Sequence, residues 1–378
     1  MSSDRLHALH AAGQSIWLDY IDRRMLHDGS LERRIRDEAL TGMTSNPTIF
    51  EKALAEGQAY DEQLRAAKEG LSAWELFELV EVQDVQAACD QFRGVYDATN
   101  GGDGYVSIEV SPGVANDPDA TIEEGRRLWA AVGRPNVMVK VPGTESGARA
   151  VQALVEEGVN VNVTLLFAVD AHRRVMEAYL AALEARAARG EPVDRVASVA
   201  SFFVSRVDNE VDKRLDALAP ALPEDRRAHA LALRGKAAIA NAVMAYQAFR
   251  ATFSGPRWEA LAARGAMVQR PLWASTSTKN PAYRDVLYVE QLIGPDTVNT
   301  MPPATLDAFR DHGETARTVD ADPAGAERTL ADLEALGVSM REVTDKLLAD
   351  GIASFQKSFD GLLAGLEQRV ASLAAAVR

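Results

Sequence analysis

The sequence predicts an α/β fold, a (β/α)8 TIM barrel with additional helices that include a C-terminal helical segment. First, short β-rich runs alternate with amphipathic segments along most of the 378 residues, which is typical of βα units and a parallel sheet. Second, the candidate strands number eight, the count that a closed barrel needs. Third, several strands place polar side chains on one face and aliphatic side chains on the other. We therefore expect one lumen to collect the polar groups.

The predicted strands are short runs rich in β-branched residues. In chain order they span residues 15–20, 42–45, 105–110, 137–141, 159–164, 196–201, 267–274 and 296–300. Helical periodicity lies between them, for example over 122–132, 147–157, 168–188 and 206–218. Two stretches exceed what a barrel requires: a long Ala-rich helix over 226–253 and a region from about residue 320 onwards. We expect residues 1–378 to form a single domain, with about 320–378 as a helical extension that packs on the barrel.

Alternation within the strands separates polar from aliphatic side chains. In the fourth strand, for example, Val139 and Val141 point away from the side on which Lys140 lies. In a barrel, alternate residues face the helices or the lumen, and catalytic groups project from the C-terminal ends of the strands. The polar side chains that one lumen would collect are Asp19, Glu109, Lys140, Asn162 and Thr164. A half-buried antiparallel sheet would give the same alternation, but the intervening helical segments favour the barrel.

Lys140 ends its strand in a chain that gives most of its positive charge to arginine. Eight of the 41 basic residues are lysines, and six of the eight fall in stretches with helical periodicity, namely Lys52, Lys68, Lys213, Lys236, Lys346 and Lys357. Arginine stays protonated in a protein, whereas a buried lysine can lose its proton and attack a carbonyl. The placement of Lys140 therefore indicates that an amine is required. The alternative is a strand-end lysine that points into water.

The composition restricts the class of protein. With 47% hydrophobic and 25% charged residues the chain is ordinary for a globular protein, and a net charge of −14 without a basic block argues against a nucleic-acid or anionic-membrane partner. No apolar run is long enough to cross a bilayer and no signal-peptide pattern is present, so we expect a cytoplasmic protein. No metal-ligand or nucleotide-binding spacing occurs, so we expect neither a metal nor a cofactor. The sequence leaves the oligomeric state open.

The expected lumen has the parts for class I aldol chemistry. A lysine amine condenses with a ketone to give a protonated Schiff base, which is the electron sink for C–C cleavage without a metal. Carboxylates beside the amine move the protons, and amide and hydroxyl groups hold the substrate.

Seven segments, in order along nearly the whole chain, resemble the transaldolase family in its longer bacterial form. They are SIWLDYI with Asp19, GMTSNPTIFEKAL with Asn46, VSIEVSP with Glu109, VMVKVPGT with Lys140, NVTLLF with Asn162 and Thr164, SFFVSR with Ser201, Phe203 and Arg206, and RPLWASTSTKNP with Ser275 and Lys279. The resemblance implies a (β/α)8 barrel whose Schiff-base lysine is Lys140. It also implies that small-molecule sugar phosphates are the partners.

The resemblance implies a role for each of these residues. Asp19 would be the acid/base that takes the proton from the substrate hydroxyl as the C–C bond breaks. Glu109, with Thr164, would position the water that carries protons during imine formation and hydrolysis. The residues that would hydrogen-bond the dihydroxyacetone unit are Asn46, Asn162 and Ser201. Taken alone, the Asn46 segment also fits a simple strand-to-loop turn.

The phosphate site departs from the family pattern at one position. Arg206 would bind the phosphate, but where related enzymes carry a second cation, two residues after Ser275, this chain has Ser277. We expect Lys279 to replace that cation through a longer turn, with Ser275 and the backbone contributing. The alternative is that Lys279 is exposed and Arg206 acts alone.

The resemblance implies transfer of a dihydroxyacetone unit from sedoheptulose 7-phosphate to glyceraldehyde 3-phosphate, giving erythrose 4-phosphate and fructose 6-phosphate. One rival is an aldolase that releases free dihydroxyacetone from fructose 6-phosphate, but such relatives are shorter and tend to carry Gln and Tyr where this chain has Glu109 and Phe203. A second rival is a catalytically silent barrel that binds sugar phosphates. The amphipathic C-terminal segment would lie near the mouth of the active site.

Overall fold

The computed structural model describes residues 3–55, 58–68 and 70–375, and it confirms the (β/α)8 barrel. In these residues eight parallel strands pair in chain order, and β8 closes the barrel against β1. They are β1 (Gln14–Asp19), β2 (Leu40–Thr44), β3 (Val106–Glu109), β4 (Val137–Pro142), β5 (Val161–Leu166), β6 (Ser198–Phe203), β7 (Arg270–Ala274) and β8 (Thr297–Met301). Each predicted strand overlaps one of these, with ends that differ by at most three residues.

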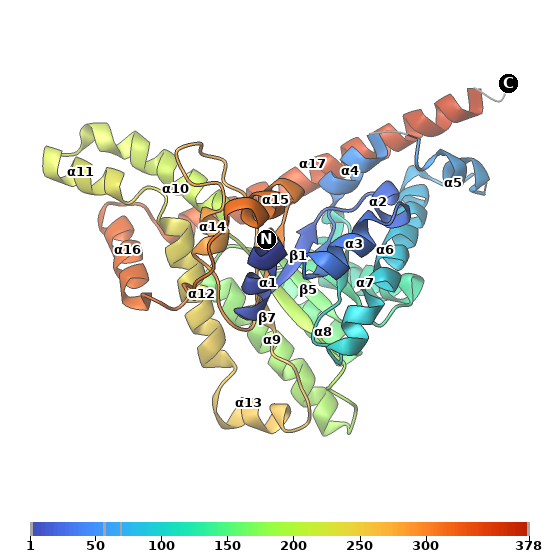
Figure 1. Ribbon diagram of the computed structural model, residues 1–378, viewed down its shortest axis with the longest axis horizontal. Helices are drawn as coiled ribbons and strands as arrows, with labels where there is room; N and C mark the ends of the chain where they lie inside the picture. The colour runs from blue at the N-terminus through green and yellow to red at the C-terminus, as the bar shows by residue number, and fades with distance from the viewer. Residues whose placement is uncertain (1–2, 56–57, 69, 376–378) are drawn as a thin grey trace.

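Helices surround the strands, as Figure 1 shows. In chain order they are α1 (Ser3–Ala11), α2 (Arg23–His27), α3 (Ser30–Asp37), α4 (Pro47–Ala55), α5 (Asp61–Ala66), α6 (Ala73–Ala98), the 3-10 turn η1 (Pro112–Val114), α7 (Pro118–Val132), α8 (Glu145–Glu156), α9 (Val169–Ala188), α10 (Ser205–Leu218), η2 (Ala219–Ala221), α11 (Glu224–Ala232), α12 (Ala237–Thr252), α13 (Gly255–Ala262), α14 (Leu287–Glu290), α15 (Pro303–His312), α16 (Pro323–Ala335) and α17 (Met340–Ala375).

The N-terminal end of the lumen is filled by a polar network. The Trp17 indole Nε1 donates to Asp103 Oδ1 at 2.8 Å, and the Ser15 hydroxyl donates to the other oxygen of the same carboxylate. Arg270, at the start of β7, donates to Ser15 Oγ at 2.7 Å. Ser15 and Trp17 lie on the same face of β1 as Asp19. The lumen is therefore filled at the N-terminal ends of the strands, and its polar groups are available at the C-terminal ends.

The predicted long helix over 226–253 is wrong, because the structure has two helices there. α11 ends at Ala232 and α12 begins at Ala237, and Gly235 between them has a φ of +71°. That left-handed conformation turns the chain, and glycine adopts it without the steric cost of a Cβ. Two of the lysines assigned to helical stretches, Lys68 and Lys236, also lie just outside helices.

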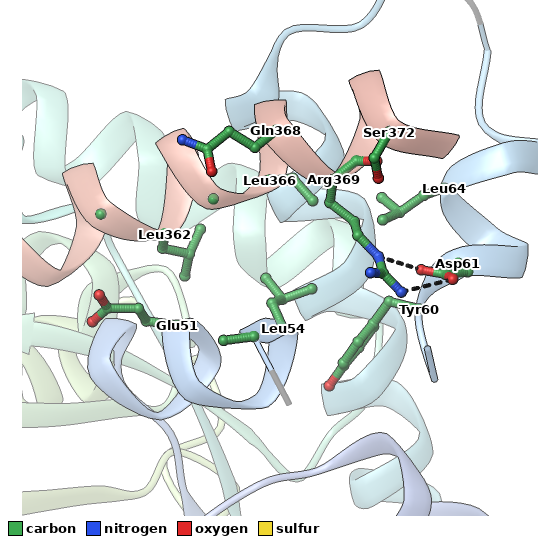
Figure 2. A pocket seen from close by; sticks show the side chains of 13 residues that line it. Glu51, Leu54, Tyr60, Asp61, Leu64, Leu362, Leu366, Gln368, Arg369 and Ser372 are labelled. Carbon is green, nitrogen blue, oxygen red and sulfur yellow. Dashed lines mark hydrogen bonds and ion pairs between the residues drawn. The ribbon is translucent and has the colours of Figure 1, made fainter. Parts of the chain in front are cut away.

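The C-terminal helix α17 packs against α4, α5, α6 and α10, and its last turns lie near α5 at the edge of the molecule in Figure 1. Its predicted apolar positions Phe355 and Phe359 are buried. Between α4, α5 and the last turns of α17 lies a cavity of about 400 Å³, separate from the barrel lumen. Figure 2 shows the Arg369 guanidinium at its edge, bonded to both oxygens of Asp61 at 2.7 and 2.8 Å.

Within the described residues, no helix combines the length and the apolar character that crossing a membrane requires.

Candidate active site

A cavity of about 700 Å³ opens at the C-terminal ends of the strands. Nine of the eleven predicted site residues line it: Asp19, Asn46, Lys140, Thr164, Ser201, Phe203, Arg206, Ser275 and Lys279. Glu109 and Asn162 do not line it, but each is bonded to a residue that does. The structure thus brings together side chains from β1, β3, β4, β5 and β6 and from the segments that follow β2, β6 and β7.

Lys140 is held rigidly because it lies within β4 and not in the loop after it. The strand continues to Pro142, and Thr144 then caps α8 by accepting a hydrogen bond from Gly147 N at 2.9 Å. Lys140 is 5% exposed. The strand on one side and the capped start of α8 on the other leave little freedom to the backbone that carries the amine.

The buried amine of Lys140 contacts two acceptors. Its Nζ lies 3.1 Å from Glu109 Oε2 and donates to the Ser45 carbonyl oxygen at 3.1 Å. Glu109 and Lys140 are register partners on β3 and β4, so the sheet itself sets their separation. Since removing one partner of a buried ion pair leaves an uncompensated charge, the two residues depend on each other.

Asp19 lies at the end of β1 and accepts a hydrogen bond from Thr44 Oγ1 at 2.8 Å. Burial raises the pKa of Asp19, while Lys140, the Thr44 hydroxyl and Arg206 oppose the rise. Burial also raises the pKa of Glu109; Lys140 opposes that rise and Asp19 adds to it. Two carboxyl groups with raised pKa values therefore flank one amine, which suits groups that must both take and return protons.

Hydroxyl and amide groups continue the lumen on β5 and β6. Ser201 Oγ donates to Asn162 Oδ1 at 2.7 Å, and Asn162 Nδ2 donates to Ser107 Oγ at 2.9 Å. The Thr164 hydroxyl is buried and makes no hydrogen bond to another described residue, so a substrate or solvent oxygen is its available partner. The next residue, Leu165, has a φ of +57°, and this uncommon conformation coincides with a register shift in β5.

The contacts of Asn46 fit both a turn and a substrate-binding role. Its Oδ1 accepts from Ile49 N at 3.0 Å, which stabilises the first turn of α4, beginning at Pro47. Its amide nitrogen is a separate donor, and the side chain lines the cavity. The turn therefore does not exclude a binding role.

Arg206 is the more enclosed of the two predicted phosphate ligands. It belongs to the first turn of α10, which begins without a side-chain cap, and its guanidinium carbon lies 5.2 Å from the centre of the Phe203 ring. Burial lowers the pKa of Arg206 and Asp19 opposes the change, but an arginine remains charged. A helix N-terminus and a guanidinium together favour an anion.

Lys279 lines the cavity but is exposed, and its Nζ donates to Ser277 Oγ at 2.9 Å. Ser275, at the end of β7, has a φ of +55° and shares a hydrogen bond of 3.0 Å between its hydroxyl and that of Ser205. Lys279 therefore faces the cavity, as a phosphate ligand would, but it is also exposed, as the alternative expects.

Sequence reasoning missed several residues that line the cavity, among them Thr44, Thr300, Lys52, Asn209 and Phe355. Thr44 and Thr300 share a hydrogen bond of 2.6 Å and lie near the C-terminal ends of β2 and β8, a position that could have identified them. Phe355 comes from α17, and nothing in its local sequence indicates this contact.

No group of three or more His, Cys, Asp or Glu side chains is placed to hold a metal ion in residues 3–55, 58–68 and 70–375.

The fold and the cavity define a class of protein. A barrel with a buried lysine amine 3.1 Å from one carboxyl group, in a cavity that a second carboxyl group also lines, has the equipment of an enzyme that forms a Schiff base with a carbonyl substrate.

Comparison with known proteins narrows the class. A family model described as "Transaldolase/Fructose-6-phosphate aldolase" matches residues 16–366. A transaldolase from Trichodesmium erythraeum is 45% identical over 377 residues, which cover 99% of each chain. One from Thermobifida fusca is 48% identical, covering 97% of this chain and 98% of the relative. This chain belongs to the transaldolase/fructose-6-phosphate aldolase family.

Proposed function

We propose that the chain is a transaldolase, an enzyme that transfers an aldehyde or ketone unit. It moves dihydroxyacetone from sedoheptulose 7-phosphate to glyceraldehyde 3-phosphate and so forms erythrose 4-phosphate and fructose 6-phosphate. The observation that carries this proposal is the buried Lys140 amine 3.1 Å from Glu109, in a cavity that Asp19 also lines. Relatives of nearly the same length that are named transaldolase support it.

The reaction begins when neutral Lys140 attacks the ketone carbon of the donor. Loss of water from the resulting carbinolamine gives a protonated imine, and Glu109 with Thr164 moves the protons through a water molecule in this step. Asp19 then takes the proton of the hydroxyl on the carbon that leaves, the C–C bond breaks, and its electron pair enters the imine to form an enamine. The phosphorylated aldehyde leaves, and the same steps run in reverse with the acceptor aldehyde.

Binding of the three-carbon unit falls to Asn46, Asn162 and Ser201, with Phe203 against it. Arg206 holds the phosphate, assisted by Lys279 and Ser275. Support comes from the position of Arg206 in the first turn of α10, where Ser205 and Asn209 line the same cavity.

The alternative aldolase reaction, which releases free dihydroxyacetone, has less support. The family description includes it, but the relatives that match at full length are named transaldolase. Glu109 and Phe203 also stand at positions where the resemblance implies that such aldolases tend to carry Gln and Tyr.

Residues 1–378 form a single domain in this proposal, and about 320–378 is its helical extension. The contacts of α17 with α4, α6 and α10 support that arrangement. The protein acts in the cytoplasm on small sugar phosphates, without a nucleic-acid partner.

Two measurements test the proposal. A coupled assay should detect erythrose 4-phosphate when both substrates are supplied. Borohydride added with fructose 6-phosphate should leave a reduced three-carbon adduct on Lys140, found by peptide mass. Lys140→Arg should be inactive because its guanidinium stays protonated, whereas Lys213→Arg, on an exposed helical position, should be active. An adduct on another lysine would refute the mechanism.

A further inference from the structure

Two carboxylates on α10 each bind a tyrosine from the segment that follows β7. Asp212 Oδ2 accepts from the Tyr283 hydroxyl at 2.5 Å, and Asp208 Oδ2 accepts from the Tyr288 hydroxyl at 2.8 Å. The two carboxylates are four positions apart in the sequence, so they lie on the same face of the helix. Both are buried, at 7% and 1% exposure respectively. α10 is also the helix that carries Arg206.

The second oxygen of each carboxylate accepts from a backbone amide in the turn between α11 and α12 or in the first turn of α12. Asp212 Oδ1 accepts from Gly235 N at 3.0 Å and Asp208 Oδ1 accepts from Ala238 N at 2.7 Å. Tyr283 packs directly on Gly235, where a Cβ would lie 2.8 Å from the Tyr283 Cζ atom. The tyrosine hydroxyl therefore meets an acceptor that is already held in place.

The near end of the same segment is tied to the start of α10. Ser205 N donates to the Ser275 carbonyl oxygen at 3.0 Å, and the two serine hydroxyls share a further hydrogen bond. In the sequence, Lys279 lies between Ser275, which makes these hydrogen bonds, and Tyr283. Inside the segment, Thr278 Oγ1 donates to the Arg284 carbonyl oxygen at 3.2 Å, so a displacement of Tyr283 would be passed to the backbone of Lys279.

We infer that the hydrogen bond from Tyr283 to Asp212 positions Lys279 relative to Arg206 and thereby sets the affinity of the site for phosphate. Tyr283 is a positioning residue, since it is not among the residues that line the cavity. Tyr288 is 1% exposed and belongs to α14, so its bond to Asp208 fixes the far end of the segment. This inference rests on the proposed function, because it assumes that Arg206 and Lys279 bind the phosphate of the substrate.

Tyr283→Phe removes the hydroxyl and keeps the ring on Gly235. The KM for glyceraldehyde 3-phosphate should rise about three- to tenfold, and by no more than in Lys279→Ala, because the substitution acts only through the position of Lys279, while kcat changes little. The KM for unphosphorylated glyceraldehyde should not change. In a Lys279→Ala background the same substitution should have no further effect, because the pair acts through Lys279.

Tyr60→Phe is the matched control, since Tyr60 donates to Asp84 at 2.9 Å in a similar tyrosine–aspartate pair away from the cavity. It should leave both KM values at wild-type levels. Equal KM changes for the two acceptors in Tyr283→Phe, or an undiminished effect in the Lys279→Ala background, would overturn the inference and make the bond merely structural.

Binding of inorganic phosphate separates this inference from the proposed function. Phosphate should raise the Tm of the wild type, and the rise should be smaller for Tyr283→Phe than for Tyr60→Phe at the same phosphate concentration. If the wild type makes no erythrose 4-phosphate but this difference is found, the proposed function fails and the positioning role stands. If the wild type is a transaldolase and the two variants respond equally to phosphate, the positioning role fails alone.

Discussion

At the scale of single residues, the main feature of the site is that burial acts on both carboxyl groups in the same direction. It raises the pKa values of Asp19 and Glu109, while the Lys140 amine opposes both shifts. Transfer of the Lys140 proton to either carboxylate removes two charges from a buried site and leaves a neutral amine. Attack on a ketone needs the neutral amine, so a nearby carboxyl group that can take its proton suits this step.

The two carboxyl groups should fail in different steps when they are neutralised. Asp19→Asn should lower kcat by about 10²–10⁴-fold, the usual contribution of general acid–base catalysis, yet still form an adduct that borohydride traps. Glu109→Gln, which loses the ion pair with Lys140 at 3.1 Å, should slow the formation of that adduct. Quenched-flow trapping with fructose 6-phosphate measures both rates. Glu367→Gln on the exposed side of α17 is the control. Adduct formation at the wild-type rate in Glu109→Gln would exclude the water-relay role of Glu109.

The Thr44 hydroxyl should influence the pH dependence through Asp19. Its hydrogen bond to Asp19 lowers the pKa of that carboxyl, so Thr44→Val should raise the pKa further. Asp19 accepts a proton only when ionised, and a higher pKa therefore moves the acid limb of the kcat/KM profile to higher pH. Profiles of wild type, Thr44→Val and the remote control Thr329→Val test this. A limb that stays in place, or moves to lower pH, would show that Asp19 does not control it.

At the scale of elements, the sequence predicts the strands better than the helices between them. Strand ends lie within three residues of their predicted positions because short runs rich in β-branched residues are typical of strands. The break at Gly235 was missed because alanine-rich periodicity continues on both sides of it, although a glycine was present. Contacts such as that of Phe355 with the cavity depend on how α17 crosses the barrel, which local periodicity does not encode.

The same limit applies to the proposed phosphate site. Arg206 follows a predicted strand and was found from its motif, but the environment of Lys279 depends on ties between segments about 70 residues apart. The serine at 277, where a cation was expected, turns out to accept a hydrogen bond from Lys279 at 2.9 Å. The sequence identifies both residues as candidates. That Arg206 is enclosed and Lys279 is exposed depends on tertiary contacts, which the local sequence does not encode.

Arg206 and Lys279 should therefore contribute unequally to phosphate binding. Charge-assisted hydrogen bonds are worth about 1.5–3 kcal/mol each, so Arg206→Ala should raise the KM for glyceraldehyde 3-phosphate by about ten- to a hundredfold. Lys279→Ala should raise it by less than tenfold, because solvent screens an exposed cation. Unphosphorylated glyceraldehyde, measured in parallel, should show little change. Equal losses for both acceptors would assign the residues to general structure, and an unchanged KM in Lys279→Ala would leave Arg206 as the ligand.

At the scale of the whole molecule, the net charge of −14 opposes the approach of any anionic substrate. A dianionic sugar phosphate must therefore be bound by cations close to it, since charges beyond about 8 Å are largely screened at physiological ionic strength. Arg206, Lys279 and Lys52 all line the cavity and supply positive charge close to where the phosphate is expected.

The whole enzyme should need no metal ion, because the protonated imine on Lys140 supplies the electron sink that a divalent cation provides in metal-dependent aldolases. After exhaustive treatment with EDTA and removal of the chelator, formation of erythrose 4-phosphate should continue at the untreated rate. Adding back magnesium, manganese or zinc at low concentration should not increase it. A control sample carried through the same steps without chelator corrects for losses in handling. Loss of activity that a single divalent ion restores would mean that a metal, and not the Lys140 imine, stabilises the carbanion, and it would contradict the mechanism even if an adduct on Lys140 were trapped.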